Sequence, residues 1–153
     1  MELILWRHAE AEDGNGKRDT DRELTKKGRR HAEGMAQWLR PRLSKEWRIV
    51  VSPAKRTLQT VAPLEMEYET REEAGLGATA RSVIDVVQWP DSKRPTLVVG
   101  HQPTLGEVVS VLLKGKEGGV SMKKGAVWWF ATRRRVDGDE TVLKAVLNPD
   151  MLE

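Results

Sequence analysis

The sequence predicts a single α/β domain, built as a three-layer α/β/α sandwich around a mixed, mainly parallel central sheet. Strand-like apolar runs over residues 2–7, 47–52 and 96–101 alternate with segments of helical periodicity. This alternation is typical of parallel strands covered by helices on both faces. Two further strand-like runs near the C-terminus surround a turn sequence, which indicates an antiparallel hairpin at one edge. The chain of 153 residues has no linker or repeat, so we expect one domain over residues 1–153.

The composition is that of a soluble globular protein. Apolar residues make up 39% and charged residues 32% of the sequence, which argues against disorder. The longest apolar runs have the length of strands and no signal-peptide pattern opens the chain, so we expect neither a membrane segment nor secretion. The absence of cysteine excludes disulfides, thiolate catalysis and cysteine metal sites, and it is typical of a cytoplasmic protein.

The formal net charge of +3 comes with local clusters of basic residues. We interpret these clusters mainly as solvated faces and ends of secondary-structure elements. Attraction of an anionic substrate or of an acidic protein surface is the functional alternative. No recognisable nucleic-acid-binding motif accompanies them, so we expect no nucleic-acid partner. The clusters lie at residues 26–27, 29–30, 123–124 and 133–135.

The N-terminal third of the chain should contain one strand and one long helix. Residues 2–7 form the predicted first strand, and the polar segment over 9–25 is typical of a loop. Thr25 is a good N-cap for a helix over residues 26–40. His31 lies on this helix, and we interpret it as a packed residue rather than a functional one.

The second strand, over residues 47–52, should lead directly into a helix. Ser52 is its expected N-cap and Pro53 its first helical position, and the helix should break near Pro63. The remaining expected elements continue the alternation and end in the hairpin. They are a short strand over 65–70, a loop over 72–79, a helix over 80–89, a strand over 96–101, a helix starting at 103–104, a loop over 114–124, and strands over 126–132 and 141–147.

Two of the three histidines directly follow predicted buried strands. His8 comes after the first strand, and His101 ends the strand-like run over 96–101. Parallel strands bring their carboxyl ends to the same edge of a sheet, where ligands bind in open α/β folds. We therefore expect both imidazoles to meet in one crevice.

Two arginines should join these histidines. Arg7 precedes His8, and Arg56 lies near the start of the helix after the second strand. A surface arginine paired with an acid is the structural alternative for Arg56, whereas the functional interpretation is a guanidinium aimed at a phosphoryl group. Such a cationic pocket suits phosphoryl transfer through a covalent phosphohistidine. The pattern offers no carboxylate cluster and too few histidines for a metal site, so we expect no metal and no cofactor.

Three segments carry a resemblance to a known family. Residues 5–10, 52–60 and 99–105 resemble, in the right order, the three signatures of the histidine phosphatase superfamily. The segment over 22–28 and the short chain are most similar to the SixA-type phosphohistidine phosphatase branch. The resemblance spans roughly residues 2–115 and implies a phosphoglycerate mutase-like fold.

The resemblance implies a role for each residue of the predicted pocket. His8 would be the nucleophile that becomes phosphorylated. Arg7 and Arg56 would bind the phosphoryl oxygens, and His101 would complete the pocket and stabilise the transition state. Arg22, in the loop before the first helix, and the backbone N–H groups near Gln102 would also contact the substrate.

Two features depart from the family pattern. Ala9 stands where the superfamily motif has glycine, and alanine disfavours a positive φ, so we expect no strained turn there. Larger members that act on sugar phosphates use a carboxylate to protonate the leaving group. In the equivalent region only Glu72 and Glu73 are available, and we interpret both as surface acids.

The missing acid bears on the expected substrate. A histidine leaving group carries its own proton near neutral pH, because the pKa of imidazole is close to about 6.5. We therefore expect the substrate to be phosphohistidine in a protein, such as a histidine phosphotransfer domain. A small phosphorylated metabolite is the alternative substrate, and a non-catalytic phosphate-binding module is the alternative function.

Overall fold

β1 (Glu2–Arg7) lies near the middle of a six-stranded sheet with the order β3-β2-β4-β1-β5-β6. The computed structural model describes residues 1–153. β4 (Thr96–Gly100) pairs in parallel with β1, β2 (Arg48–Val51) pairs in parallel with β4, and β3 (Glu69–Thr70) pairs in parallel with β2. β5 (Val127–Arg135) and β6 (Gly138–Leu147) complete the sheet as an antiparallel hairpin beside β1. The predicted mixed, mainly parallel sheet is confirmed.

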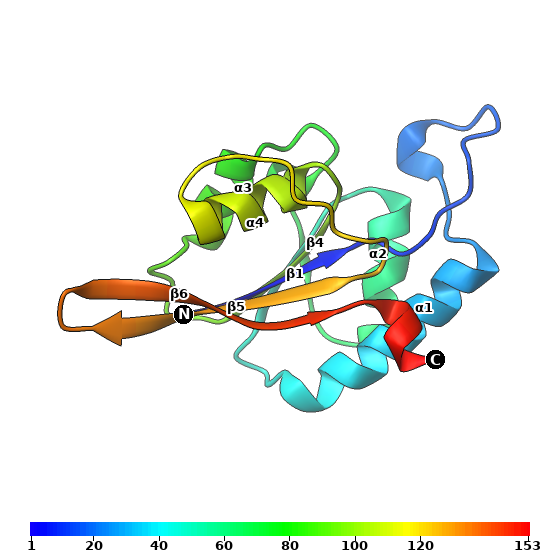
Figure 1. Ribbon diagram of the computed structural model, residues 1–153. Helices are drawn as coiled ribbons and strands as arrows, with labels where there is room; N and C mark the ends of the chain where they lie inside the picture. The colour runs from blue at the N-terminus through cyan, green and yellow to red at the C-terminus, as the bar shows by residue number, and fades with distance from the viewer.

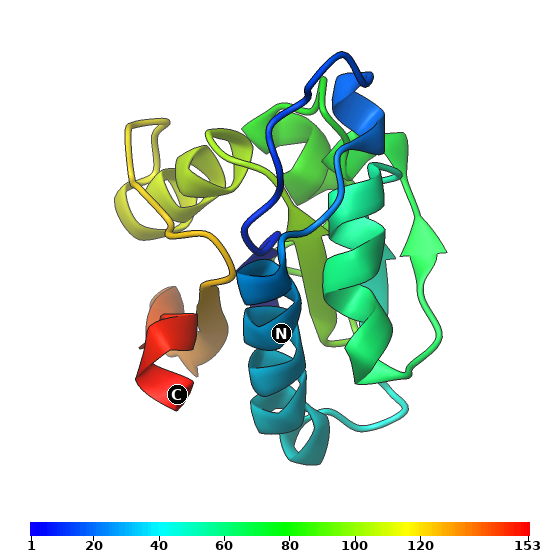
Figure 2. The same cartoon turned by 90° about the vertical axis from the view of Figure 1, so that its right-hand side faces the viewer.

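Helices cover both faces of the sheet, as Figure 1 shows. α1 (Lys26–Leu39) and α2 (Lys55–Val61) lie on one face, and α3 (Ala80–Val87) and α4 (Thr104–Lys114) lie on the other. Figure 2 shows the same arrangement turned by 90°, with α1 in front of the sheet. Short 3-10 turns complete the chain: η1 (Asp19–Asp21), η2 (Arg40–Arg42), η3 (Ala62–Leu64), η4 (Glu72–Ala74) and η5 (Pro149–Leu152).

The alternation of side chains along β1 supplies both layers of the core. Ile4 and Trp6 are buried in a cluster with Met35 of α1, and Leu3 and Leu5 are buried in a second cluster with residues of α3 and α4. All four β1 side chains are fully buried. A strand that is apolar on both faces therefore forms the centre of a three-layer sandwich, as its sequence predicted.

The first and second helices begin differently. The Thr25 hydroxyl accepts a hydrogen bond from the backbone N–H of Gly28, so the predicted cap of α1 is confirmed. The predicted start of α2 is wrong by two residues, because α2 begins at Lys55 with Ala54 as its N-cap. Ser52 does not cap the helix, since its hydroxyl is turned toward the strand ends and contacts His101 at 2.7 Å.

The C-terminal hairpin is longer than predicted. β5 and β6 extend to a turn at residues 136–137, and the tip of the hairpin reaches well beyond the helical layers in Figure 1. Arg134 pairs with Asp139 and Arg135 with Glu140 across the two strands. These exposed pairs fit our interpretation of this basic cluster as a solvated face. None of the helices combines the length and the apolar character needed to traverse a bilayer.

Candidate active site

Three adjacent strand ends form the centre of the site. β4 lies between β2 and β1, with Arg7 opposite Gly100 and Val51 opposite Val99 in the parallel ladders. The residues that follow these strands therefore meet at one edge of the sheet. The His8 and His101 rings lie 5.4 Å apart between centroids, so the expected meeting of the two imidazoles is confirmed.

The contacts of His8 define which ring nitrogen is free. His8 Nδ1 lies 2.7 Å from the carbonyl oxygen of Ala9. A carbonyl can only accept a hydrogen bond, so Nδ1 carries the proton and the lone pair is on Nε2. The His8 backbone is held by the carbonyl of Gly100 and by the N–H of Gly125. His8 is thus a buried imidazole with a fixed orientation and one unprotonated nitrogen.

Ala9, which stands where the family motif has glycine, adopts a backbone conformation without a positive φ. It is fully buried, and its N–H donates to the Thr60 hydroxyl at 3.0 Å. Its carbonyl is the group that orients His8. The predicted absence of a strained turn at Ala9 is confirmed.

Arg56 is buried and Arg7 is half-buried, and each has a buried Nε that makes no hydrogen bond. Arg7 Nη1 donates to the carbonyl of Met122 at 2.8 Å, and both terminal nitrogens of Arg56 contact Asp19. Four buried side-chain polar atoms in the protein lack a hydrogen-bond partner, and three of them are Arg7 Nε, Arg56 Nε and His101 Nδ1. Buried polar groups are normally paired, so this concentration at one place indicates a site for an anion.

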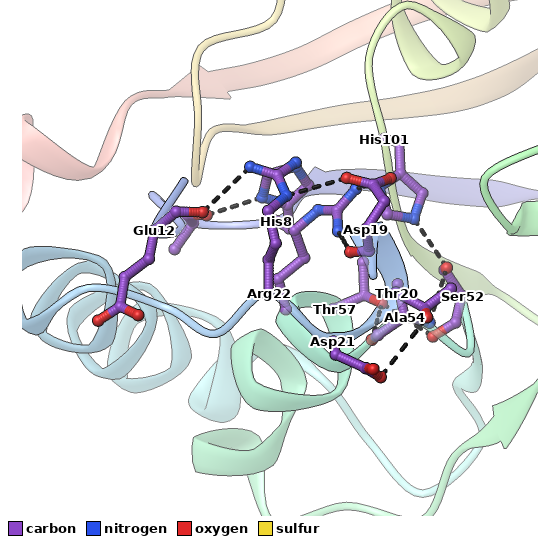
Figure 3. Close-up of polar contacts among 12 residues, drawn as sticks. His8, Glu12, Asp19, Thr20, Asp21, Arg22, Ser52, Ala54, Thr57 and His101 are labelled. Atoms are coloured by element: carbon purple, nitrogen blue, oxygen red, sulfur yellow. Dashed lines mark hydrogen bonds and ion pairs between the residues drawn. The ribbon is translucent and has the colours of Figure 1, made fainter. Parts of the chain in front are cut away.

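Asp19, at the start of η1, is a site residue that the sequence pattern does not predict. Its carboxylate accepts from Arg22 Nε at 2.9 Å and from Arg56 Nη2 at 3.3 Å, and its carbonyl accepts from Arg56 Nη1 at 2.6 Å. Figure 3 shows Asp19 and Arg22 beside His8 and His101. Arg22 also donates to the carbonyl of Glu12 at 3.2 Å. An acidic residue in a polar loop has no pattern that would reveal this pairing in advance.

The predicted site residues line one pocket of about 420 Å³. Its carboxylates are Asp13 and Asp19, whereas Glu72 and Glu73 lie outside it and Glu73 pairs with Arg71. No group of three or more His, Cys, Asp or Glu side chains is arranged to hold a metal ion. The lining residues are Arg7, His8, Ala11, Asp13, Asp19, Arg22, Arg56, Leu76, His101, Gln102, Pro103, Thr104 and Lys124.

Gln102 lines the pocket, but both ends of its side-chain amide are already bonded. Its Oε1 accepts from the N–H of Gly106 at 2.8 Å, and its Nε2 donates to the carbonyl of Val120 at 3.1 Å. The backbone N–H of Gln102 has no partner in the protein. The backbone N–H is therefore the only Gln102 donor without a partner in the protein, and its contact with a substrate stays a prediction.

Comparison with known proteins assigns the chain to a family. A family model described as the histidine phosphatase superfamily, branch 1, matches residues 3–77. A phosphohistidine phosphatase SixA homolog from Haemophilus influenzae is 33% identical over 136 residues, covering 79% of this chain and 82% of that protein. The chain belongs to the histidine phosphatase superfamily. Its similarity to the SixA homolog places it in the SixA-type branch.

Two solved phosphatase structures share the fold. The protein histidine phosphatase SixA complexed with tungstate is 23% identical and covers 100% of both chains with a TM-score of 0.80. A phosphoserine phosphatase from Entamoeba histolytica, in complex with phosphoserine, is 18% identical and covers 99% of both chains with a TM-score of 0.74. The predicted phosphoglycerate mutase-like fold is confirmed, and the family identifies the chain as a phosphatase.

The environment of this histidine phosphatase's pocket keeps both imidazoles neutral. Burial lowers the pKa of His8 to about 3; the hydrogen bond to the Ala9 carbonyl opposes this shift, and the positive charges of Arg56 and Arg7 add to it. Burial also lowers the pKa of His101 to about 4, with Arg56 contributing and Asp19 opposing. Burial lowers the pKa of the Arg7 and Arg56 guanidiniums too, but guanidinium stays charged throughout the neutral range. The site thus combines neutral imidazoles with fixed positive charge.

We expect the free energy of unfolding to fall as the pH drops from 7 to 5. His8 and His101 bind a proton below about pH 6.5 when unfolded but only near pH 3 and 4 when folded. The unfolded state therefore takes up more protons in this window, at a cost of about 2 kcal/mol per histidine at pH 5. Urea unfolding at both pH values measures the difference.

A variant in which both histidines are replaced by asparagine is the control for this pH dependence. It should lose most of the decrease in unfolding free energy between pH 7 and pH 5, because asparagine does not titrate. An equal decrease in the variant and in the native protein would show that other groups cause it.

Proposed function

We propose that this chain hydrolyses phosphohistidine in a protein, through a covalent phosphohistidine formed on His8. The observation that carries the proposal is the group of three unpartnered buried nitrogens, Arg7 Nε, Arg56 Nε and His101 Nδ1, around the neutral His8. A phosphoryl group offers acceptor oxygens to each of them. A structurally similar SixA binds tungstate, which is also an oxyanion.

In the first step, His8 Nε2 attacks the phosphorus atom. A P–Nε2 bond forms as the bond from phosphorus to the substrate's imidazole breaks. His8 keeps its Nδ1 proton, which the Ala9 carbonyl holds, so the modified ring becomes a phosphorylated imidazolium. Arg7 and Arg56 neutralise the charge on the phosphoryl oxygens in the transition state.

In the second step, water attacks the same phosphorus atom. The P–Nε2 bond breaks and His8 leaves as a neutral imidazole that still carries its Nδ1 proton, while the water proton goes to the phosphate or to solvent. The covalent intermediate divides one difficult displacement into two easier ones. The positive charge of the phosphorylated ring makes His8 a good leaving group.

The state of the pocket's carboxylates favours a substrate whose leaving group is an imidazole, which needs no acid from the protein. Protonation of an alkoxide needs an acid with a raised pKa, but Arg56 and Arg22 outweigh the effect of burial and hold the pKa of Asp19 below its usual value. Asp13 is the other carboxylate of the pocket. Phosphohistidine avoids this requirement, because its second ring nitrogen can be protonated and the imidazole then leaves as a neutral molecule.

We expect kcat/KM for a phosphohistidine peptide to exceed that for the matching phosphoserine peptide by roughly 10²-fold or more, the usual size of a general-acid contribution. Release of inorganic phosphate from both peptides measures the ratio. A small phosphorylated metabolite is the alternative substrate. Hydrolysis of phosphoserine or of a sugar phosphate at a higher kcat/KM than phosphohistidine would favour that alternative and contradict the proposed substrate.

A further inference from the structure

The hydroxyl of Ser52 has two hydrogen-bonding neighbours. Which of them donates and which accepts follows from the number of protons available. Ser52 is fully buried. The backbone N–H of Ala54 donates to its oxygen at 3.2 Å, and His101 Nε2 lies 2.7 Å away. The hydroxyl has one proton of its own, and Nε2 is its only acceptor. The hydroxyl therefore donates to Nε2.

This hydrogen bond determines the tautomer of His101. With Nε2 as the acceptor, the ring proton of the neutral imidazole must be on Nδ1. The opposite tautomer would leave the buried hydroxyl proton without an acceptor, at the cost of an unsatisfied polar group. It would also leave a lone pair, rather than an N–H, on Nδ1. Nδ1 is the nitrogen that is buried without a partner, on a ring that lines the pocket.

We propose that Ser52 is a positioning residue that holds His101 in the Nδ1–H tautomer, so that this N–H donates to the transferring phosphoryl group. The inference rests on the proposed function for the identity of the ligand. The tautomer matters because burial lowers the pKa of His101 to about 4. At neutral pH the ring has only one proton, and the wrong tautomer would turn a lone pair toward an anion.

The two histidines of the site are then held in the same tautomer by opposite means. The Ala9 carbonyl accepts from His8 Nδ1, so His8 keeps its lone pair on Nε2 for attack. The Ser52 hydroxyl donates to His101 Nε2, so His101 keeps its N–H on Nδ1 for the phosphoryl oxygens. One tautomer thus yields a nucleophile on one ring and a hydrogen-bond donor on the other.

Nitrogen-15 NMR of the imidazoles in the ligand-free protein tests the tautomer directly. The His101 signals are assigned by their loss in His101→Asn. At pH 7 we expect Nδ1 of His101 to show the shift of a protonated ring nitrogen and Nε2 that of an unprotonated one. In Ser52→Ala the Nδ1–H tautomer should lose its predominance, and Ser52→Thr, which keeps the hydroxyl, should restore it.

Kinetics with the phosphohistidine peptide tests the consequence for the reaction. Ser52→Ala should lower kcat about 10- to 100-fold, as expected for a group that orients a functional histidine, and Ser52→Thr should recover most of the loss. Thr57→Val is the matched control, because the Thr57 hydroxyl bonds the carbonyls of Ser52 and Ala54 in the same turn without contacting His101. It should leave the His101 tautomer unchanged.

An Nε2-protonated His101 in the native protein would overturn the inference, and so would an unchanged tautomer and kcat in Ser52→Ala. The NMR measurement involves no substrate, so it separates this inference from the proposed function. An Nδ1–H tautomer that depends on Ser52, in a protein without activity on phosphohistidine, would uphold the role of Ser52 in orienting His101. The same result would refute the proposed substrate.

Discussion

Replacing His8 by alanine is expected to lower kcat/KM for the phosphohistidine peptide by roughly 10⁴-fold or more, the scale on which loss of a covalent nucleophile acts. With the lone pair of His101 Nε2 engaged by the Ser52 hydroxyl, His8 Nε2 has the only imidazole lone pair of the pocket that is free to attack. The variant should also acquire no label when it is mixed with a ³²P-phosphorylated substrate and quenched in alkali, where phosphohistidine is stable. The native protein should acquire label on His8.

The remaining histidine provides a matched control for His8→Ala. His31 lies on α1 outside the active-site pocket, and its Nε2 contacts Glu153 at 3.1 Å. His31→Gln keeps a hydrogen-bonding side chain there and should leave both the labelling and kcat/KM within a fewfold range of the native values. Turnover by His8→Ala at a rate comparable to the native protein would refute covalent catalysis at this residue.

The sequence reveals the strand-end residues because they depend on local pattern and on one topological rule. His8 and His101 each follow a strand that is buried on both faces, and the edge where they meet follows from parallel pairing. Neither inference requires knowledge of side-chain contacts. The same rule cannot say that β4 lies between β1 and β2, which is the arrangement that brings Ser52 to His101.

Ser52 and Asp19 show where prediction from the sequence fails. A serine before proline at the end of a strand is typical of a helix N-cap, so the sequence predicts that role for Ser52. Only the position of His101 in the folded protein shows that the Ser52 hydroxyl bonds to its imidazole instead. Asp19 lies in a loop without periodicity, 37 residues from Arg56 along the chain. Its pairing depends on how that loop folds back over the pocket, which no local pattern encodes.

Arg56→Ala is expected to lower kcat/KM by about 10²- to 10³-fold, the usual effect of removing one preorganised donor from a transition state. Arg56 is only 3% exposed, and Arg56 Nε is one of the unpartnered nitrogens at the site. Arg56→Lys should recover part of the loss, because it retains the charge without the planar fork that binds two oxygens. Steady-state kinetics with the phosphohistidine peptide measures both variants.

Because Arg56 pairs with Asp19, the kinetics of Arg56→Ala require a control in which Asp19 is replaced instead. Arg56 also anchors η1 through its hydrogen bonds to Asp19, so Arg56→Ala removes this anchor together with the guanidinium. Asp19→Ala removes the side-chain half of the pair and leaves Arg56 in place. Because the carboxylate competes with a phosphoryl group for the same guanidinium, Asp19→Ala should keep kcat within a fewfold range and lower KM. A loss in Asp19→Ala as large as in Arg56→Ala would instead show that Arg56 acts by holding the loop.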